Sequence, residues 1–119
     1  MPRTNWTEVH APALATQATI TRAAGAAGVR HYCQKLQATL GAAAMPADAI
    51  NVHVRDGAAG AGAILWSGAL SAPAAGSNVL SASFDPPIMG TAATQMTVEF
   101  AAAGPAGSAE TVNAQGFDL

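Results

Sequence analysis

The chain has 119 residues, the size of a single domain, and a net charge of −2 at pH 7. Only 10% of its residues are charged, and its five Lys and Arg are spread along the chain, so no nucleic-acid partner is expected. No apolar run reaches the ~18 residues of a membrane-spanning helix, and no signal peptide is visible. The single cysteine, Cys33, excludes an intrachain disulfide. So few charges favour an assembled state over a free monomer.

Residues 1–15 show no regular pattern and contain two prolines, so we expect an extended N-terminal arm here. The arm contains three large apolar side chains, Trp6, Val9 and Leu14, which are the candidate partner-binding residues. Trp6 can contact a neighbouring chain or fold back over its own domain. The sequence leaves both alternatives open.

Two strands are predicted after the arm, over residues 16–22 and 29–40. The first alternates loosely and is rich in threonine, which favours β structure. One face of the second strand has the larger side chains, namely Tyr32, Gln34, Leu36, Ala38 and Leu40. The face expected to point outward has His31, Cys33, Lys35, Gln37 and Thr39. A helix is the competing interpretation, because Tyr32, Leu36 and Leu40 are spaced by four residues, but the alternating threonine and glutamine favour a strand.

Residues 50–70, INVHVRDGAAGAGAILWSGAL, predict the central β-hairpin of the fold. Apolar and polar residues alternate over 50–55, which is the period of a strand with one buried face. Asp56-Gly57 then breaks the run, a loop of small residues follows, and a second apolar run ends near residue 70. We expect Trp66, in this second run, to lie in the core.

Three further strands are predicted, over residues 79–84, 94–101 and 110–119. Pro86-Pro87 is expected to end the first of them, because proline cannot donate a hydrogen bond to a strand ladder. Residues 88–90 are expected to form a short edge piece. Loops rich in glycine and proline separate the strands.

This pattern predicts an all-β fold with about seven or eight short strands, and no strand alternates with a long helix. We expect an antiparallel β-sandwich with a jelly-roll-like arrangement. An immunoglobulin-like sandwich is the alternative, weakened because the chain has no Cys–Trp–Cys pattern. The predicted organisation is an arm over residues 1–15 followed by one sandwich domain over residues 16–119.

No catalytic or metal-binding motif is readable, so we expect a non-enzymatic protein without cofactor or metal. Asp56 and Asp85 lie in turn contexts, where their side chains are expected to cap backbone amides. His31 and His53 are expected on outward faces of adjacent strands, as a surface pair. Cys33 is two residues from His31, but no strained turn or helix N-terminus is indicated to activate its thiol, so we expect a small strand side chain there.

Four stretches of the chain carry a family resemblance. They are RHYC at 30–33, NVHVRDG at 51–57 with ILWS at 64–67, ATQMTVEF at 93–100, and ETVNAQGFD at 110–118. In this order and spacing they resemble small structural proteins of tailed-bacteriophage virions, most of all head decoration (cement) proteins. The resemblance covers about residues 28–119 and leaves the arm out.

The resemblance implies a protein that is made in the host cytoplasm and binds the outer surface of the major capsid protein shell in the virion. It implies homotrimers at local threefold axes, with arm residues such as Trp6 and Leu14 buried against neighbouring subunits. The alternative is a receptor- or carbohydrate-binding module of a head fibre or tail fibre. That alternative needs an exposed aromatic platform, for which Trp6, Tyr32 and Trp66 are the available residues.

Overall fold

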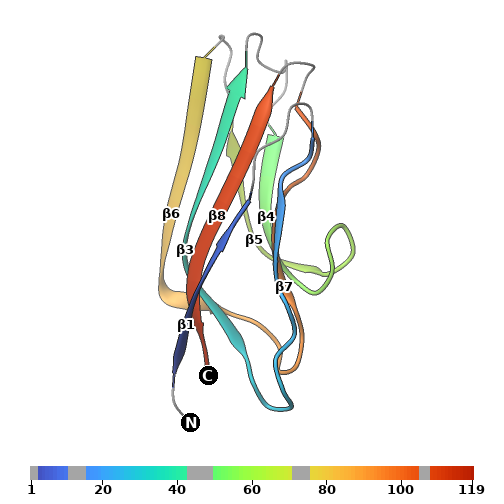
Figure 1. Cartoon of the computed structure of the whole chain (residues 1–119), viewed down its shortest axis with the longest axis vertical. Coiled ribbons are helices and arrows are strands. Elements are labelled where there is room, and N and C mark those ends of the chain that lie inside the picture. Colours follow the sequence, from blue (N-terminus) through green and yellow to red (C-terminus); the bar gives the residue numbers. More distant parts are fainter. Residues whose placement is uncertain (1–2, 11–15, 43–49, 71–75, 105–107) are drawn as a thin grey trace.

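The computed structural model describes residues 3–10, 16–42, 50–70, 76–104 and 108–119. These residues form eight strands in two four-stranded sheets and contain no helix, and therefore none that could cross a membrane. All strand pairs are antiparallel. The predicted all-β sandwich is confirmed. The molecule is elongated, 47 × 24 × 22 Å, and both chain ends lie at the same end of it (Figure 1).

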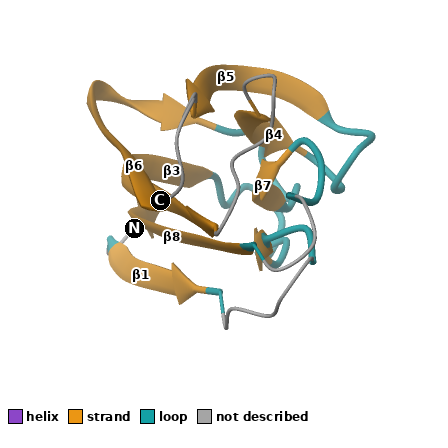
Figure 2. Cartoon of the chain, turned by 90° about the horizontal axis from the view of Figure 1, so that it is seen from above, coloured by secondary structure: helices purple, strands orange, loops and turns teal. Residues whose placement is uncertain are grey.

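The strands follow a nested order. Sheet A consists, in order, of β1 (Thr4–Val9), β8 (Ala109–Asp118), β3 (His31–Ala42) and β6 (Gly76–Met89). Sheet B consists of β2 (Thr19–Arg22), β7 (Met96–Phe100), β4 (Ile50–Asp56) and β5 (Ala63–Leu70). Thus β1 pairs with β8, β2 with β7, β3 with β6 and β4 with β5. Figure 2 shows the two layers from above, with β1, β8, β3 and β6 in one and β4, β5 and β7 in the other. This is the strand order of a long hairpin wrapped into two sheets.

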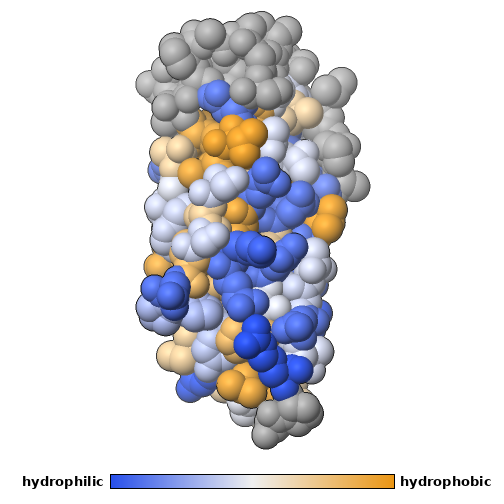
Figure 3. Space-filling view, turned by 90° about the vertical axis from the view of Figure 1, so that its left-hand side faces the viewer, coloured by the Kyte–Doolittle hydropathy of each residue, from blue (hydrophilic) through white to orange (hydrophobic). Residues whose placement is uncertain are grey.

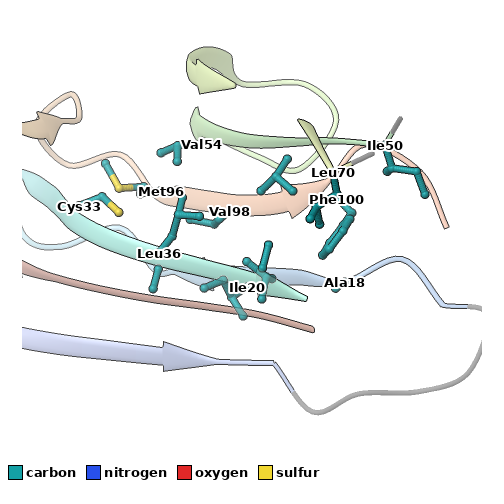
Figure 4. Packing of buried hydrophobic residues seen from close by; sticks show 14 of the residues in the cluster. Ala18, Ile20, Cys33, Leu36, Ile50, Val54, Leu70, Met96, Val98 and Phe100 are labelled. Atoms are coloured by element: carbon teal, nitrogen blue, oxygen red, sulfur yellow. The ribbon is translucent and has the colours of Figure 1, made fainter. Parts of the chain in front are cut away.

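The hydrophobic core fills the space between the two sheets (Figure 4). Phe100 and Met96 of β7 and Leu40 of β3 are among its largest fully buried side chains. The predicted hairpin over residues 50–70 forms as β4 and β5. Its Trp66 is only partly buried and packs edge-on against Phe84 of β6, with ring centroids 5.2 Å apart, where the edge strands β5 and β6 approach each other.

The prediction of an unpacked arm is wrong for Thr4–Val9, which form β1 and pair with β8 along its length. Trp6 lies opposite Gly116, and its side chain is only 6% exposed. The absence of a side chain at Gly116 makes room for the indole, since a Cβ there would come within 2.6 Å of the Trp6 ring. The sandwich therefore begins with β1 rather than at residue 16.

A β-bulge in β3 reverses which side chains point inward, so the predicted faces of this strand are wrong before the bulge and right after it. The pairing with β8 shifts between Cys33 and Lys35, so Gln34 is an extra residue without a partner on β8. Odd-numbered side chains point inward before it, and even-numbered ones from 36 to 40 after it. After the bulge, Leu36, Ala38 and Leu40 point inward, as expected. Before the bulge it is His31 and Cys33 that are buried, at 1% and 0% exposure, and their predicted outward orientation is wrong.

Strand β6 continues past the two prolines that were expected to end it. Lys35 of β3 pairs with Ser83, and the next β6 residue to pair is Ile88, opposite Cys33. Residues 84–87 therefore lie outside the regular ladder, where a missing backbone donor costs no hydrogen bond, and β6 bends sharply in Figure 1. The edge piece predicted at residues 88–90 is the end of this same strand, which stops at Met89.

Candidate functional site

The three predicted partner-binding residues do not form one surface. Trp6 belongs to the core, so of the two alternatives the structure shows the one in which it folds back over its own domain. Val9 is 67% exposed at the end of β1. Leu14 lies outside the described residues. Trp6 is thus corrected from a contact residue to a core residue.

A cluster of charged side chains joins the two sheets beside Trp6. Arg22 of β2 donates to Asp118 of β8 at 2.7 Å and lies 3.5 Å from Glu8 of β1. His31 contributes from β3, with Nδ1 2.6 Å from the Asp118 carboxylate and Nε2 2.7 Å from the carbonyl oxygen of Ala23. Both of these oxygens are acceptors, so only the doubly protonated imidazolium satisfies both contacts.

The cluster controls the ionisation of Asp118. Burial opposes the charged form, but the hydrogen bonds from Arg22 and His31 outweigh it and hold the pKa of Asp118 below its ordinary value. Four strands from both sheets contribute, and His31 and Asp118 are mostly buried. Each charge faces an opposite charge rather than an open cavity. The arrangement ties the sheets together and presents no reactive group.

A second buried carboxylate, Glu99 of β7, holds the loop of the central hairpin. The side chain is 2% exposed and accepts from Arg55 Nε at 2.5 Å and from the backbone N–H of Gly60 at 3.0 Å. Arg55 also donates to the carbonyl of Gly62 at 2.8 Å. The loop of small residues therefore folds over the outer face of sheet B. The alternating pattern of β7 gives no sign that Glu99 is buried.

Cys33 is a small buried strand side chain, and His31 does not activate its thiol. Burial raises the pKa of the Cys33 thiol to about 12, and both ring nitrogens of His31 are engaged elsewhere. His53, the expected partner of His31 on the surface, lies on the other sheet and is only 8% exposed. Among the described residues, no group of three or more His, Cys, Asp or Glu side chains could hold a metal ion. Asp56 caps a turn as predicted, accepting from the backbone N–H of Thr91 at 3.0 Å.

The aromatic residues considered for a glycan platform are dispersed. Trp6 is in the core and Trp66 packs on Phe84. Tyr32 lies on the outer face of sheet A, stacked on Phe117 with ring centroids 4.7 Å apart. The guanidinium of Arg3 covers the Phe117 ring at 3.9 Å. No open aromatic platform forms from these residues.

The sequence did not predict a groove of about 440 Å³ that lies on the outer face of sheet A. Each strand of the sheet contributes two outward side chains to it: Thr7 and Val9, Asn113 and Gln115, Lys35 and Gln37, and Ser81 and Ser83. Figure 3 shows the side of the molecule on which sheet A lies, with hydrophilic side chains dominating the middle of the face. The sequence shows only that alternate residues of these four strands are polar. Which strands lie side by side, and so which polar residues meet, cannot be read from it.

Searches of protein-family models, of curated proteins and of solved structures give no match to this chain.

Proposed function

We propose that this protein is a non-enzymatic structural protein of the bacteriophage virion, a decoration (cement) protein that binds the outer surface of the major capsid protein shell and stabilises it. The observation that carries the proposal is the ordered set of four resembling stretches. These stretches fall on β3, on the β4–β5 hairpin, on β7 and on β8, which are five of the eight strands and belong to both sheets. A rigid sandwich of this kind offers long strand edges and flat faces for docking on a shell.

The edge strand β5 is the surface proposed to meet the shell. Its eight residues, Ala63–Leu70, include no charge and no proline, and one side of the strand has no neighbour in sheet B. Ile64 and Leu65 on this strand are 51% and 37% exposed. The strand has one β-bulge, at Leu65, where its register with β4 shifts. An edge strand without charge or proline can accept a further strand through main-chain hydrogen bonds beyond such a bulge, so an extended segment of the capsid protein fits here.

The other three edges carry charges, prolines or short length, and β5 has none of these. Strand β1 has Glu8 as its last residue but one, and β2 is only four residues long and ends in Arg22. Strand β6 contains Asp85 followed by two prolines. Charges, prolines and short length are the usual devices that keep an edge from pairing. The contrast favours β5 as the docking edge, in place of the arm.

Cosedimentation with undecorated capsids tests this contact. Ile64→Lys places a charge on the docking edge and is expected to weaken capsid binding by about tenfold or more, because the charge would be desolvated against the shell. Val79→Lys is the matched control, since Val79 is 56% exposed on another edge strand. Equal binding by the two variants would remove β5 from the proposal. Absence of binding by the unmodified chain would remove the decoration role itself.

The proposed stoichiometry is three copies around each local threefold axis of the shell. Linked contacts raise the overall affinity without any new interaction, so a modest contact per copy is sufficient. Light scattering of the free chain measures whether it reaches the shell as a trimer.

A second candidate is a receptor- or carbohydrate-binding module of a head or tail fibre. It is favoured by a separate observation, the groove on the outer face of sheet A. Its expected aromatic platform does not form, so this candidate depends on hydrogen-bonding side chains.

A further inference from the structure

We infer that the groove on the outer face of sheet A binds carbohydrate chains. The inference deepens the second candidate function and does not depend on capsid binding, because the groove and the β5 edge lie on different sheets. Its volume of about 440 Å³ is in the usual range of small-ligand sites, about 300–1,000 Å³.

The register of sheet A arranges the lining side chains as two parallel rows that cross all four strands. One row runs Thr7, Gln115, Lys35 and Ser83, each directly opposite the next. The second row runs Val9, Asn113, Gln37 and Ser81. Side chains directly opposite in antiparallel strands lie about 5 Å apart, so the rows form a regular grid of hydrogen-bonding groups.

The chemistry of this grid fits a polyhydroxylated ligand. Gln37, Gln115 and Asn113 offer amides that both donate and accept, and the serine and threonine hydroxyls do the same. The Asn113 Oδ1 atom is buried and has no hydrogen-bond partner among the described residues. Val9, 67% exposed at the rim, offers an apolar contact for the C–H face of a sugar ring. Neighbouring hydroxyls of a sugar both donate and accept, which matches these side chains.

Other ligand classes fit the groove less well. It has one charge, Lys35, so it lacks the several cations that a nucleic-acid backbone requires. An extended peptide binds a sheet through the free backbone groups of an edge, whereas these strands are paired within the sheet along the groove. A lipid chain requires an apolar lining, and Val9 is the single large apolar side chain that points into the groove from the outer face.

Affinity electrophoresis of the full chain in native gels tests the inference. The probes are two neutral polysaccharides, dextran and galactomannan, and two carboxylate-bearing ones, alginate and hyaluronan. We expect at least one of them to retard the chain in proportion to its concentration. Retardation by the acidic pair alone, lost in Lys35→Gln, would assign the ligand as an acidic glycan; retardation by a neutral polymer would assign a neutral one.

A double variant, Gln37→Ala with Gln115→Ala, locates the binding. Both side chains are exposed, so the fold should tolerate the change, which thermal unfolding checks. The loss of two amide groups is expected to lower the affinity about tenfold or more. Asn51→Ala, an exposed amide on sheet B, is the matched control and should bind as the unmodified chain does. The inference is overturned if none of the four polymers retards the chain, or if the double variant is retarded as strongly as the control.

Discussion

At the scale of single residues, the fold depends on a few close fits that link distant parts of the chain. Trp6 fills the space left by a glycine on β8, more than a hundred residues later in the chain. His31 and Asp118, 87 residues apart in the chain, meet through a side-chain contact. The residues next to each partner in the sequence do not indicate such a contact. For this reason Trp6 was predicted on an arm and His31 on the surface.

Gly116→Ala should be strongly destabilising. A Cβ at this position would collide with the carbonyl oxygen of Tyr32 and with the Trp6 ring, and the backbone oxygen cannot move aside without disturbing the ladder. We expect a loss of about 3 kcal/mol in the free energy of unfolding, measured by urea denaturation. Gly28→Ala is the comparison: its φ of 83° makes alanine unfavourable, but no atom lies within 4 Å, so about 1 kcal/mol is expected. Equal costs for the two variants would contradict the proposed fit.

Asp118→Asn should remove a stabilising contribution that depends on pH. The native pKa of Asp118 is below its ordinary value of 3.8, held there against burial by Arg22 and His31. Its contribution is therefore fully present above that ordinary value and is lost as the pH falls through the lowered native value. At pH 7 the variant should be less stable by about 2 kcal/mol, and the difference should shrink below pH 4.

Thermal unfolding of the two proteins between pH 2 and pH 8 measures this difference. Asp85→Asn, at an exposed position, is the control and should follow the unmodified chain throughout. A gap between Asp118→Asn and the unmodified chain that stays constant down to pH 2 would refute the assignment.

At the scale of elements, the sequence predicted the strands whose alternation is uninterrupted. The β4–β5 hairpin was found because alternating valines meet an Asp-Gly turn and the chain then returns as an apolar run. Strand β1 was missed because Glu8 lies on the same face as Trp6 and breaks the alternation of apolar and polar residues. Its charge is compensated by Arg22 of another strand, which the sequence does not reveal. The bulge at Gln34 was missed because one extra residue changes the burial parity without altering the composition.

Removal of residues 1–10 should destabilise the whole domain, since it deletes β1 and its indole. We expect a loss of about 3–5 kcal/mol, the usual cost of deleting a buried tryptophan side chain, measured by urea denaturation. Removal of residues 1–3 alone leaves β1 intact and is the control. An unchanged unfolding midpoint in the longer deletion would restore the description of this segment as a detachable arm.

At the scale of the whole molecule, the class of fold could be predicted and its surfaces could not. Alternation and turn residues are local, so they predicted a sandwich of about eight strands. The groove on sheet A, in contrast, is lined by two outward side chains from each of four strands, and these side chains are spread along the chain from Thr7 to Gln115. Its existence depends on the nested strand order, and so does the identity of β5 as an edge strand.

The central claim is that this sandwich decorates a capsid, and its most direct test is saturation binding to undecorated shells. Increasing amounts of the unmodified chain are mixed with shells of known concentration, and the bound copies per particle are counted after sedimentation. The proposal predicts saturation at many copies per particle, in multiples that match the threefold positions of the shell. No binding, or binding that rises without saturation, would contradict a decoration role and leave the groove on sheet A as the principal functional surface.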